Sequence, residues 1–193
     1  MNTKATAKIG LLVCFAYFIT VIVQIVFNNS LTLYLVSIIT MLSGLYMTML
    51  IVSFPAENEY NQFYRVMAII CVSVCMLLTN TVHFINIAAI KPLIASGIPI
   101  PDYFQIGKYP SILMAIDYLG WGLFMGLAYI FSYRFINPAT KLKRLLVICG
   151  CLCILGFIGV VFNEYFWYIA PLGYGIGTAI ICIILLKNRQ ESN

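Results

Sequence analysis

The chain has 193 residues, of which 63% are hydrophobic and only 9% are charged. Soluble domains are roughly half apolar and one quarter charged, so this composition excludes a soluble globular protein. The formal net charge of +5 comes from eleven basic and six acidic residues. It does not indicate a nucleic-acid partner, because basic residues beside apolar stretches hold cytoplasmic loops against anionic lipid.

Six long apolar stretches occupy most of the sequence. A helix needs about 20 apolar residues to cross a bilayer. The first stretch follows a short basic segment and is longer than the core of a signal peptide, without a clear cleavage site, so we expect it to remain as a span. The predicted fold class is all-α, an integral membrane bundle of six transmembrane helices in a single domain, residues 1–193. The predicted spans are residues 9–28, 31–54, 65–90, 112–136, 144–162 and 165–186.

The basic residues predict the orientation of the bundle. With the N-terminus in the cytoplasm, only Lys91 and Lys108 fall outside. The positive-inside rule therefore predicts that both termini are cytoplasmic, in the cytoplasmic (inner) membrane of the cell. The nine basic residues predicted to be cytoplasmic are Lys4, Lys8, Arg65, Arg134, Lys141, Lys143, Arg144, Lys187 and Arg189.

The seven cysteines are an odd number and include no Cys-x-x-Cys pair, so a disulfide framework is not expected. Three of them alternate along the fifth span as Cys149, Cys151 and Cys153. A helix turns by about 200° between such neighbours, so the first and third share a face and the second points away. This geometry argues against a three-thiolate metal site, and we expect neither a metal nor a cofactor.

Two segments interrupt the helical pattern. The predicted outer loop, residues 91–110, contains four prolines and two glycines and cannot be one continuous helix. Its apolar residues suggest that it folds back over the helix ends or dips into the membrane interface. It is either a lid or a passive cap. In the last span, residues 170–177 read APLGYGIG, which predicts a kinked or broken helix. This segment is either a hinge or ligand-binding turn, or an ordinary Pro/Gly-containing membrane helix.

Small residues four apart also occur twice, as Gly122 with Gly126 and as Gly173 with Gly177. Such pairs allow helices to approach closely. We expect them to pack helices within the bundle, with a homodimer interface as the alternative.

Polar residues inside a membrane are costly and tend to mark function. In the third span, Thr79, His83 and Asn86 fall within a helical arc of about 60°, with Asn80 adjacent. Further polar residues are expected at the same outer depth. They are Gln24 on the first span, Asp117 on the fourth span and Glu164 at the turn into the sixth. We predict a polar vestibule open to the outside. Its candidate ligand-binding residues are His83, Asn86, Asn80, Asp117, Glu164, Gln24 and Trp121.

His83 is the only histidine and could pair with Asp117 or Glu164. The alternative is a hydrogen-bonded interfacial histidine, and the spacing of these residues does not favour a metal site. Aromatic residues gather at both predicted interfaces, as in any multi-pass protein, although the larger outer set also fits a pocket for an organic cation. No nucleophile elbow, Gly-rich phosphate loop or His-Glu-x-x-His occurs, so we predict no catalytic residue and disfavour an enzyme.

Residues 115–128, AIDYLGWGLFMGLA, together with Val82-His83-Phe84, resemble segments of uncharacterised bacterial multi-pass membrane proteins. This resemblance implies no activity. Length and span number are also similar to the substrate-binding subunits of energy-coupling vitamin transporters. The alanine-rich first-helix motif of those subunits is missing, because residues 11–17 read LLVCFAY.

These observations favour a membrane protein that binds or transports a small solute. The first alternative is a non-catalytic accessory or regulatory subunit, and the second is an intramembrane enzyme acting on a lipid or isoprenoid. The expected partners are the lipid bilayer, a small solute, and a membrane-protein partner or a second copy of the chain.

Overall fold

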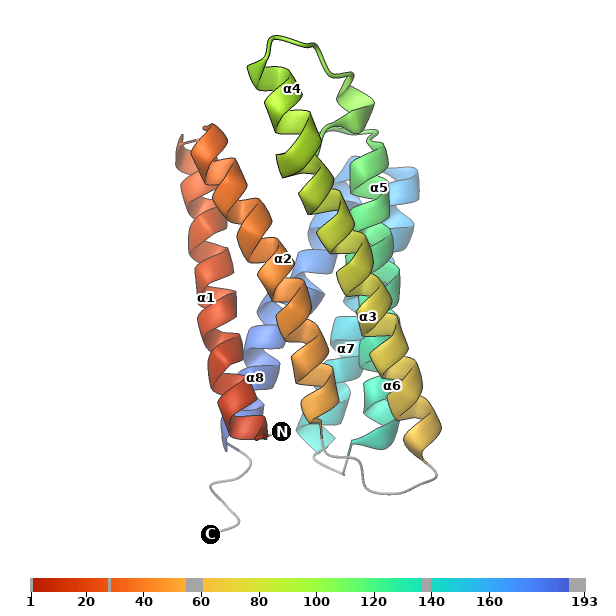
Figure 1. The fold of residues 1–193 in the computed structure, drawn as a ribbon. Coiled ribbons are helices and arrows are strands. Elements are labelled where there is room, and N and C mark those ends of the chain that lie inside the picture. Colours follow the sequence, from red (N-terminus) through yellow and green to blue (C-terminus); the bar gives the residue numbers. More distant parts are fainter. Residues whose placement is uncertain (1, 28, 55–60, 137–139, 188–193) are drawn as a thin grey trace.

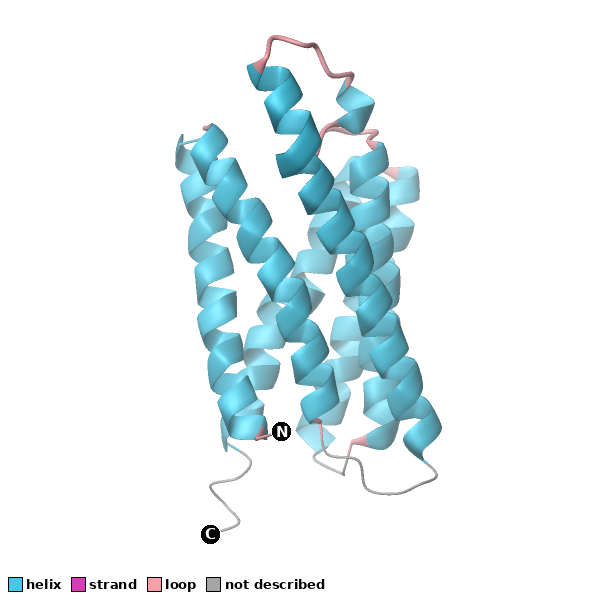
Figure 2. Ribbon diagram, in the orientation of Figure 1, coloured by secondary structure: helices cyan, strands magenta, loops and turns pink. Residues whose placement is uncertain are grey.

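The computed structural model describes residues 2–27, 29–54, 61–136 and 140–187. Over these ranges the chain forms helices joined by short loops, without a strand (Figures 1 and 2). Six helical stretches are long and apolar enough to cross a membrane, which confirms the predicted all-α class and number of spans. The predicted end of the first span, at residue 28, and the predicted cytoplasmic Arg189 lie outside the described residues.

The elements follow one another along the chain, and three of the six spans contain a π-helical segment. Spans one, two and five are each a single α-helix, whereas the other three are composite. The elements are α1 (Thr3–Phe27), α2 (Ser30–Ser53), α3 (Gln62–Ile85), π-helix η2 (Asn86–Ile90), α4 (Lys91–Ala95), 3-10 helix η3 (Asp102–Phe104), α5 (Ile112–Tyr118), π-helix η4 (Leu119–Phe124), α6 (Met125–Phe135), α7 (Thr140–Phe162), 3-10 helix η5 (Glu164–Ile169), π-helix η6 (Leu172–Gly177) and α8 (Thr178–Lys187).

The spans form a closed ring in chain order. Helix α1 packs on α2, α2 on α3, α3 on η4 and α6, and these on α7, while α8 packs on both α7 and α1. Short connections make successive spans antiparallel neighbours. The start of α1 and the end of α8 therefore lie at one end of the bundle, called the terminal end here (Figure 1). The connecting loop, residues 96–111, lies at the other end, called the loop end.

The main apolar core joins all six spans, and its largest fully buried side chains include Leu50, Tyr129, Leu146 and Ile181. The polar atoms within it are paired: the Tyr129 hydroxyl and the Thr178 Oγ1 are 2.5 Å apart. Large apolar side chains cover the outward faces of the bundle, as expected for helices in contact with lipid.

Glycines allow the close approach of α7 to its neighbours. A Cβ at Gly126 would lie 2.7 Å from the Ile154 Cγ1 and 2.9 Å from the Gly150 carbonyl oxygen. Gly122, Gly173 and Gly177 likewise face α7, where Cys149 and Cys153 are buried and Cys151 is exposed. Both small-residue pairs thus pack helices inside the bundle, and the predicted facing of the three cysteines is confirmed.

The third span is longer than the sequence predicted. Its helix continues through Pro92, near the start of α4, to Ala95 instead of ending at residue 90. Pro92 directly follows the junction of π-helix η2 and α4, so the irregular hydrogen bonding of the helix coincides with the proline that lacks an N–H donor. The 34 residues from Gln62 to Ala95 have a length of about 51 Å. Figure 1 shows α4 rising beyond the turn between α1 and α2.

The connecting loop folds back over the loop end, as predicted. Its Ile100 and Ile106 pack against a small core of Val82, Ile90 and Leu113. The Tyr109 hydroxyl donates to the Val160 carbonyl 3.0 Å away. Glycines with positive φ lie on both sides of η3, at 97 (76°) and 107 (85°), where the chain turns in a conformation that other residues rarely adopt.

We expect Gly126→Ala to destabilise the protein by about 1–3 kcal/mol, because the new methyl group would overlap the backbone of α7. The measurement is thermal unfolding in detergent. Gly175→Ala is the matched control, because nothing lies within 4 Å of a Cβ there. Equal stability of the two variants would contradict the close packing of α6 on α7.

Candidate functional site

Four buried polar side-chain atoms have no hydrogen-bond partner among the described residues. They are the Thr79 Oγ1, the Asn80 Oδ1, the His83 Nδ1 and the Asp117 Oδ1. Thr79 is fully buried and His83 is 6% exposed. Unpaired polar atoms are expensive inside a protein or a bilayer, so four of them on two neighbouring elements mark a candidate site. We call these four residues the polar cluster.

Helix α3 supplies three members of the cluster. At 100° per residue, Thr79, His83 and Asn80 cover an arc of about 100° with His83 in the middle. The same helix buries Val72, Cys75 and Val82, so this arc borders its packed face. Asn80 points toward α2, because its Oδ1 would be 3.5 Å from a Cβ at Gly44. His83 lies about 27 Å along the helix from Arg65, which places the cluster toward the loop end.

Helix α5 supplies Asp117. The helix begins after Ser111, whose hydroxyl accepts from the Met114 amide at 3.4 Å. Gly120 then lets η4 approach α3, because a Cβ there would lie 3.2 Å from both the Cys75 carbonyl oxygen and the Thr79 Oγ1. This contact brings Asp117, three residues earlier in the chain, close to Thr79.

The carboxyl group of Asp117 has no cationic neighbour among the described residues. Asp117 as a whole is half-buried. The side chains of Tyr17, Tyr118 and Tyr174 lie close enough to interact electrostatically with its carboxyl group. The ion pair between His83 and Asp117 that the sequence allowed is not formed. Asp117 is therefore an acid inside a membrane bundle without a protein counter-charge.

Aromatic side chains adjoin the cluster. Trp121 of η4 stacks on Tyr174 of η6, with ring centroids 4.6 Å apart and planes tilted by 31°. Tyr17 of α1 interacts with Tyr174 through its hydroxyl. The Tyr118 hydroxyl donates to the Trp167 carbonyl at 2.7 Å, which ties α5 to η5. The predicted site residue Trp121 is thus buried four residues after Asp117, and its partner Tyr174 and Tyr17 both lie near the Asp117 carboxyl group.

Each π-helix is adjacent to this region in sequence. Segment η2 begins three residues after His83, η4 begins two residues after Asp117, and η6 contains Tyr174. π-helical turns are rare and frequently lie at functional sites. The irregular helix predicted around Pro171 is present, as a 3-10 helix followed by a π-helix. The π-helices in the third and fourth spans were not predicted.

Of the remaining predicted site residues, Asn86 lies one helical turn beyond His83 but has a side-chain partner, and Gln24 is also paired. The Asn86 amide donates to the Ser37 Oγ at 3.4 Å, joining η2 to α2. Gln24 accepts from the Thr32 Oγ1 at 2.5 Å near the turn between α1 and α2. Glu164 begins η5, and its side chain is not among the described ones. Thr79 was not among the predicted ligand-binding residues. Helical periodicity could have identified it, because it shares a helical arc with His83.

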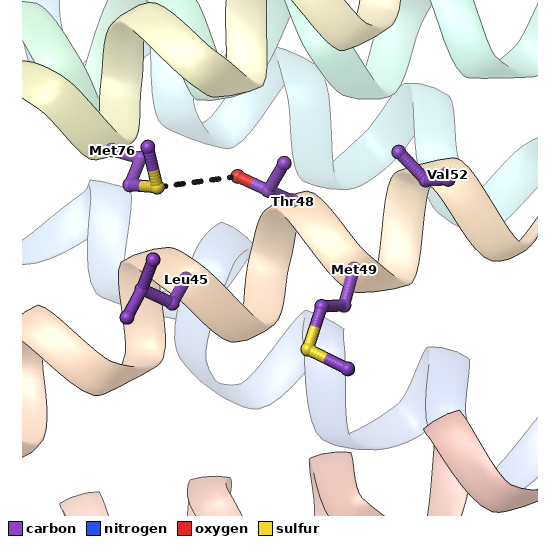
Figure 3. A pocket seen from close by; sticks show the side chains of 5 residues that line it. All are labelled: Leu45, Thr48, Met49, Val52 and Met76. Atoms are coloured by element: carbon purple, nitrogen blue, oxygen red, sulfur yellow. Dashed lines mark hydrogen bonds between the residues drawn. The ribbon is translucent and has the colours of Figure 1, made fainter.

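An apolar groove of about 400 Å³ lies between α2 and α3, beginning at Met76, one helical turn before Asn80 (Figure 3). In Figure 3, α2 carries four of its side chains and Met76 of α3 completes it. The one hydroxyl here, that of Thr48, is bonded to the Gly44 carbonyl at 3.4 Å and to the Met76 sulfur at 3.8 Å. The groove therefore suits an acyl chain better than a polar solute. Its lining residues are Leu45, Thr48, Met49, Val52 and Met76.

Comparisons of the chain with protein-family models, with curated proteins and with solved structures find no match.

We expect Thr79→Val to stabilise the ligand-free protein by about 1–3 kcal/mol, because it removes a buried hydroxyl that makes no hydrogen bond. Thr178→Val is the matched control: Thr178 is 1% exposed, but its hydroxyl bonds Tyr129. That variant should lose stability. The measurement is thermal unfolding in detergent, and equal losses in both variants would show that Thr79 has a bonded partner, such as an ordered water.

Proposed function

We propose that this protein is a small-solute binding or transport protein of the cytoplasmic membrane, and that the polar cluster is its binding site. The positive-inside rule supports placing the terminal end in the cytoplasm and the loop end outside. In this orientation the cluster lies in the outer half of the bundle. The proposed ligand-binding residues are Thr79, Asn80, His83 and Asp117, with Trp121 beside them.

The observation that carries this proposal is the set of four unpaired buried atoms. Elsewhere in the spans, hydroxyl groups are bonded to their own helix, as for Thr40, Ser43 and Ser132. Leaving a buried polar atom unpaired costs about 1–3 kcal/mol. Ligand sites retain such a cost because the ligand supplies the missing partners.

The connecting loop and the irregular helices provide a way for a solute to reach the polar cluster. The connecting loop packs close to the cluster, because Ile100 and Ile106 lie against the small core of Val82, Ile90 and Leu113, and Val82 directly precedes His83. In this proposal the loop acts as a lid and η6 acts as a hinge. A π-helical segment can revert to α-helical geometry and thereby shift the side chains that follow it.

We expect native mass spectrometry of the protein extracted from its own membranes to detect a bound small molecule. His83→Ala should lose this molecule, because the imidazole lies at the centre of the cluster arc. Thr48→Val is the control, since Thr48 lies in the apolar groove. The expected result is at least about a tenfold lower occupancy in His83→Ala, with wild-type occupancy in Thr48→Val.

A molecule lost from Thr48→Val and kept by His83→Ala would place the ligand in the groove and contradict this site. A stoichiometric protein partner without any small molecule would favour the accessory-subunit alternative. Both variants must retain wild-type thermal unfolding within about 1 kcal/mol for the comparison to count as a binding result.

A further inference from the structure

We infer that the ligand of the polar cluster is a small ammonium-type cation, a protonated amine, for which Asp117 provides the counter-charge. This inference rests on the proposed solute-binding function and names the chemical class of its ligand.

The charge balance of the bundle supports a cation. Asp117 lies in a membrane span, without a Lys or Arg side chain paired to it in the described part of the chain. The basic residues of the described spans and loops lie at the two ends of the helices, so none neutralises the acid in place. An unpaired carboxylate is costly in a bilayer, and a bound cation removes that cost.

The hydrogen-bonding capacity of the cluster favours a donor over an acceptor. As a carboxylate, Asp117 can only accept hydrogen bonds, and so can the Asn80 oxygen, while the Thr79 hydroxyl and the His83 nitrogen can accept as well. An ammonium group carries N–H donors and no acceptor, which matches this set. An anion or a carbonyl compound would place further acceptors against Asp117 and Asn80.

The aromatic neighbours also fit a cation. Trp121 and Tyr174 form a stacked pair, and Tyr17 and Tyr118 lie within electrostatic range of Asp117. Aromatic faces attract ammonium groups through their quadrupole, more strongly when the site is desolvated. A metal ion has less support, because the described residues contain no group of three His, Cys, Asp or Glu side chains that could hold one.

The test compares ligands of similar size and different charge. The full-length protein in lipid nanodiscs is titrated with ethylammonium, ethanol, acetate and sodium, each to about 50 mM at constant ionic strength, and its thermal unfolding is recorded. We expect ethylammonium alone to raise the unfolding temperature. Asp117→Asn should weaken the apparent affinity for ethylammonium at least about tenfold. Asp117→Glu, which keeps the carboxylate, should retain the preference for the cation.

Asp102→Asn is the matched control, because Asp102 is an exposed carboxylate in the connecting loop whose Oδ1 accepts from the Gln105 amide at 3.3 Å. This variant should respond to ethylammonium as the wild type does. A response lost equally in Asp102→Asn would overturn the assignment to Asp117.

The remaining outcomes separate this inference from the proposed function. Equal stabilisation by ethanol in the wild type and in Asp117→Asn would overturn the cation while leaving solute binding in place. Stabilisation by sodium alone would overturn the ammonium class. The absence of any shift in the wild type would overturn the inference, whereas loss of the bound molecule from His83→Ala would still support the proposed function.

Discussion

Every polar group inside a bilayer must find its partner within the protein, and the rest of this structure depends on that constraint. The bundle meets it almost everywhere. Buried hydroxyls bond their own helices, as Thr40 and Ser132 do, or they bond across the bundle, as Tyr129 and Thr178 do. In the part of the chain that the structure describes, the exceptions are concentrated on α3 and α5. Because the surroundings are so well paired, these exceptions are the basis of the proposed binding site.

The same region departs from regular helix geometry. All three π-helices adjoin the polar cluster or its aromatic neighbours, and Gly120 lets η4 lie against Thr79. A π-turn adds one residue to a helical turn and so rotates the side chains on either side of it. The helices of the main core keep α-helical geometry around Leu50, Leu146 and Ile181. The bundle thus combines a regular apolar core with an irregular polar region.

The sequence predicted the spans because their length and hydropathy follow directly from the thickness of the bilayer. It also placed His83, Asn80 and Asp117 near the loop end, by counting residues from the basic end of each helix. It could not separate these residues from Gln24 and Asn86, whose partners Thr32 and Ser37 lie on another helix. Helical periodicity gives the direction of a side chain, whereas pairing depends on which residue faces it across the bundle.

The main core and the loop end of the bundle are held together by different interactions. Across the main core, α6 packs backbone to backbone on α7 at Gly126 and Gly150. At the loop end, the long-range links include two tyrosine hydroxyls, those of Tyr109 to Val160 and of Tyr118 to Trp167. A hydrogen bond contributes about 1 kcal/mol net, so two of them can break at modest cost. A close-packed helix pair has no comparable alternative arrangement. If the protein changes shape when it binds a solute, the loop end is therefore the part that moves, and the main core is the frame against which it moves.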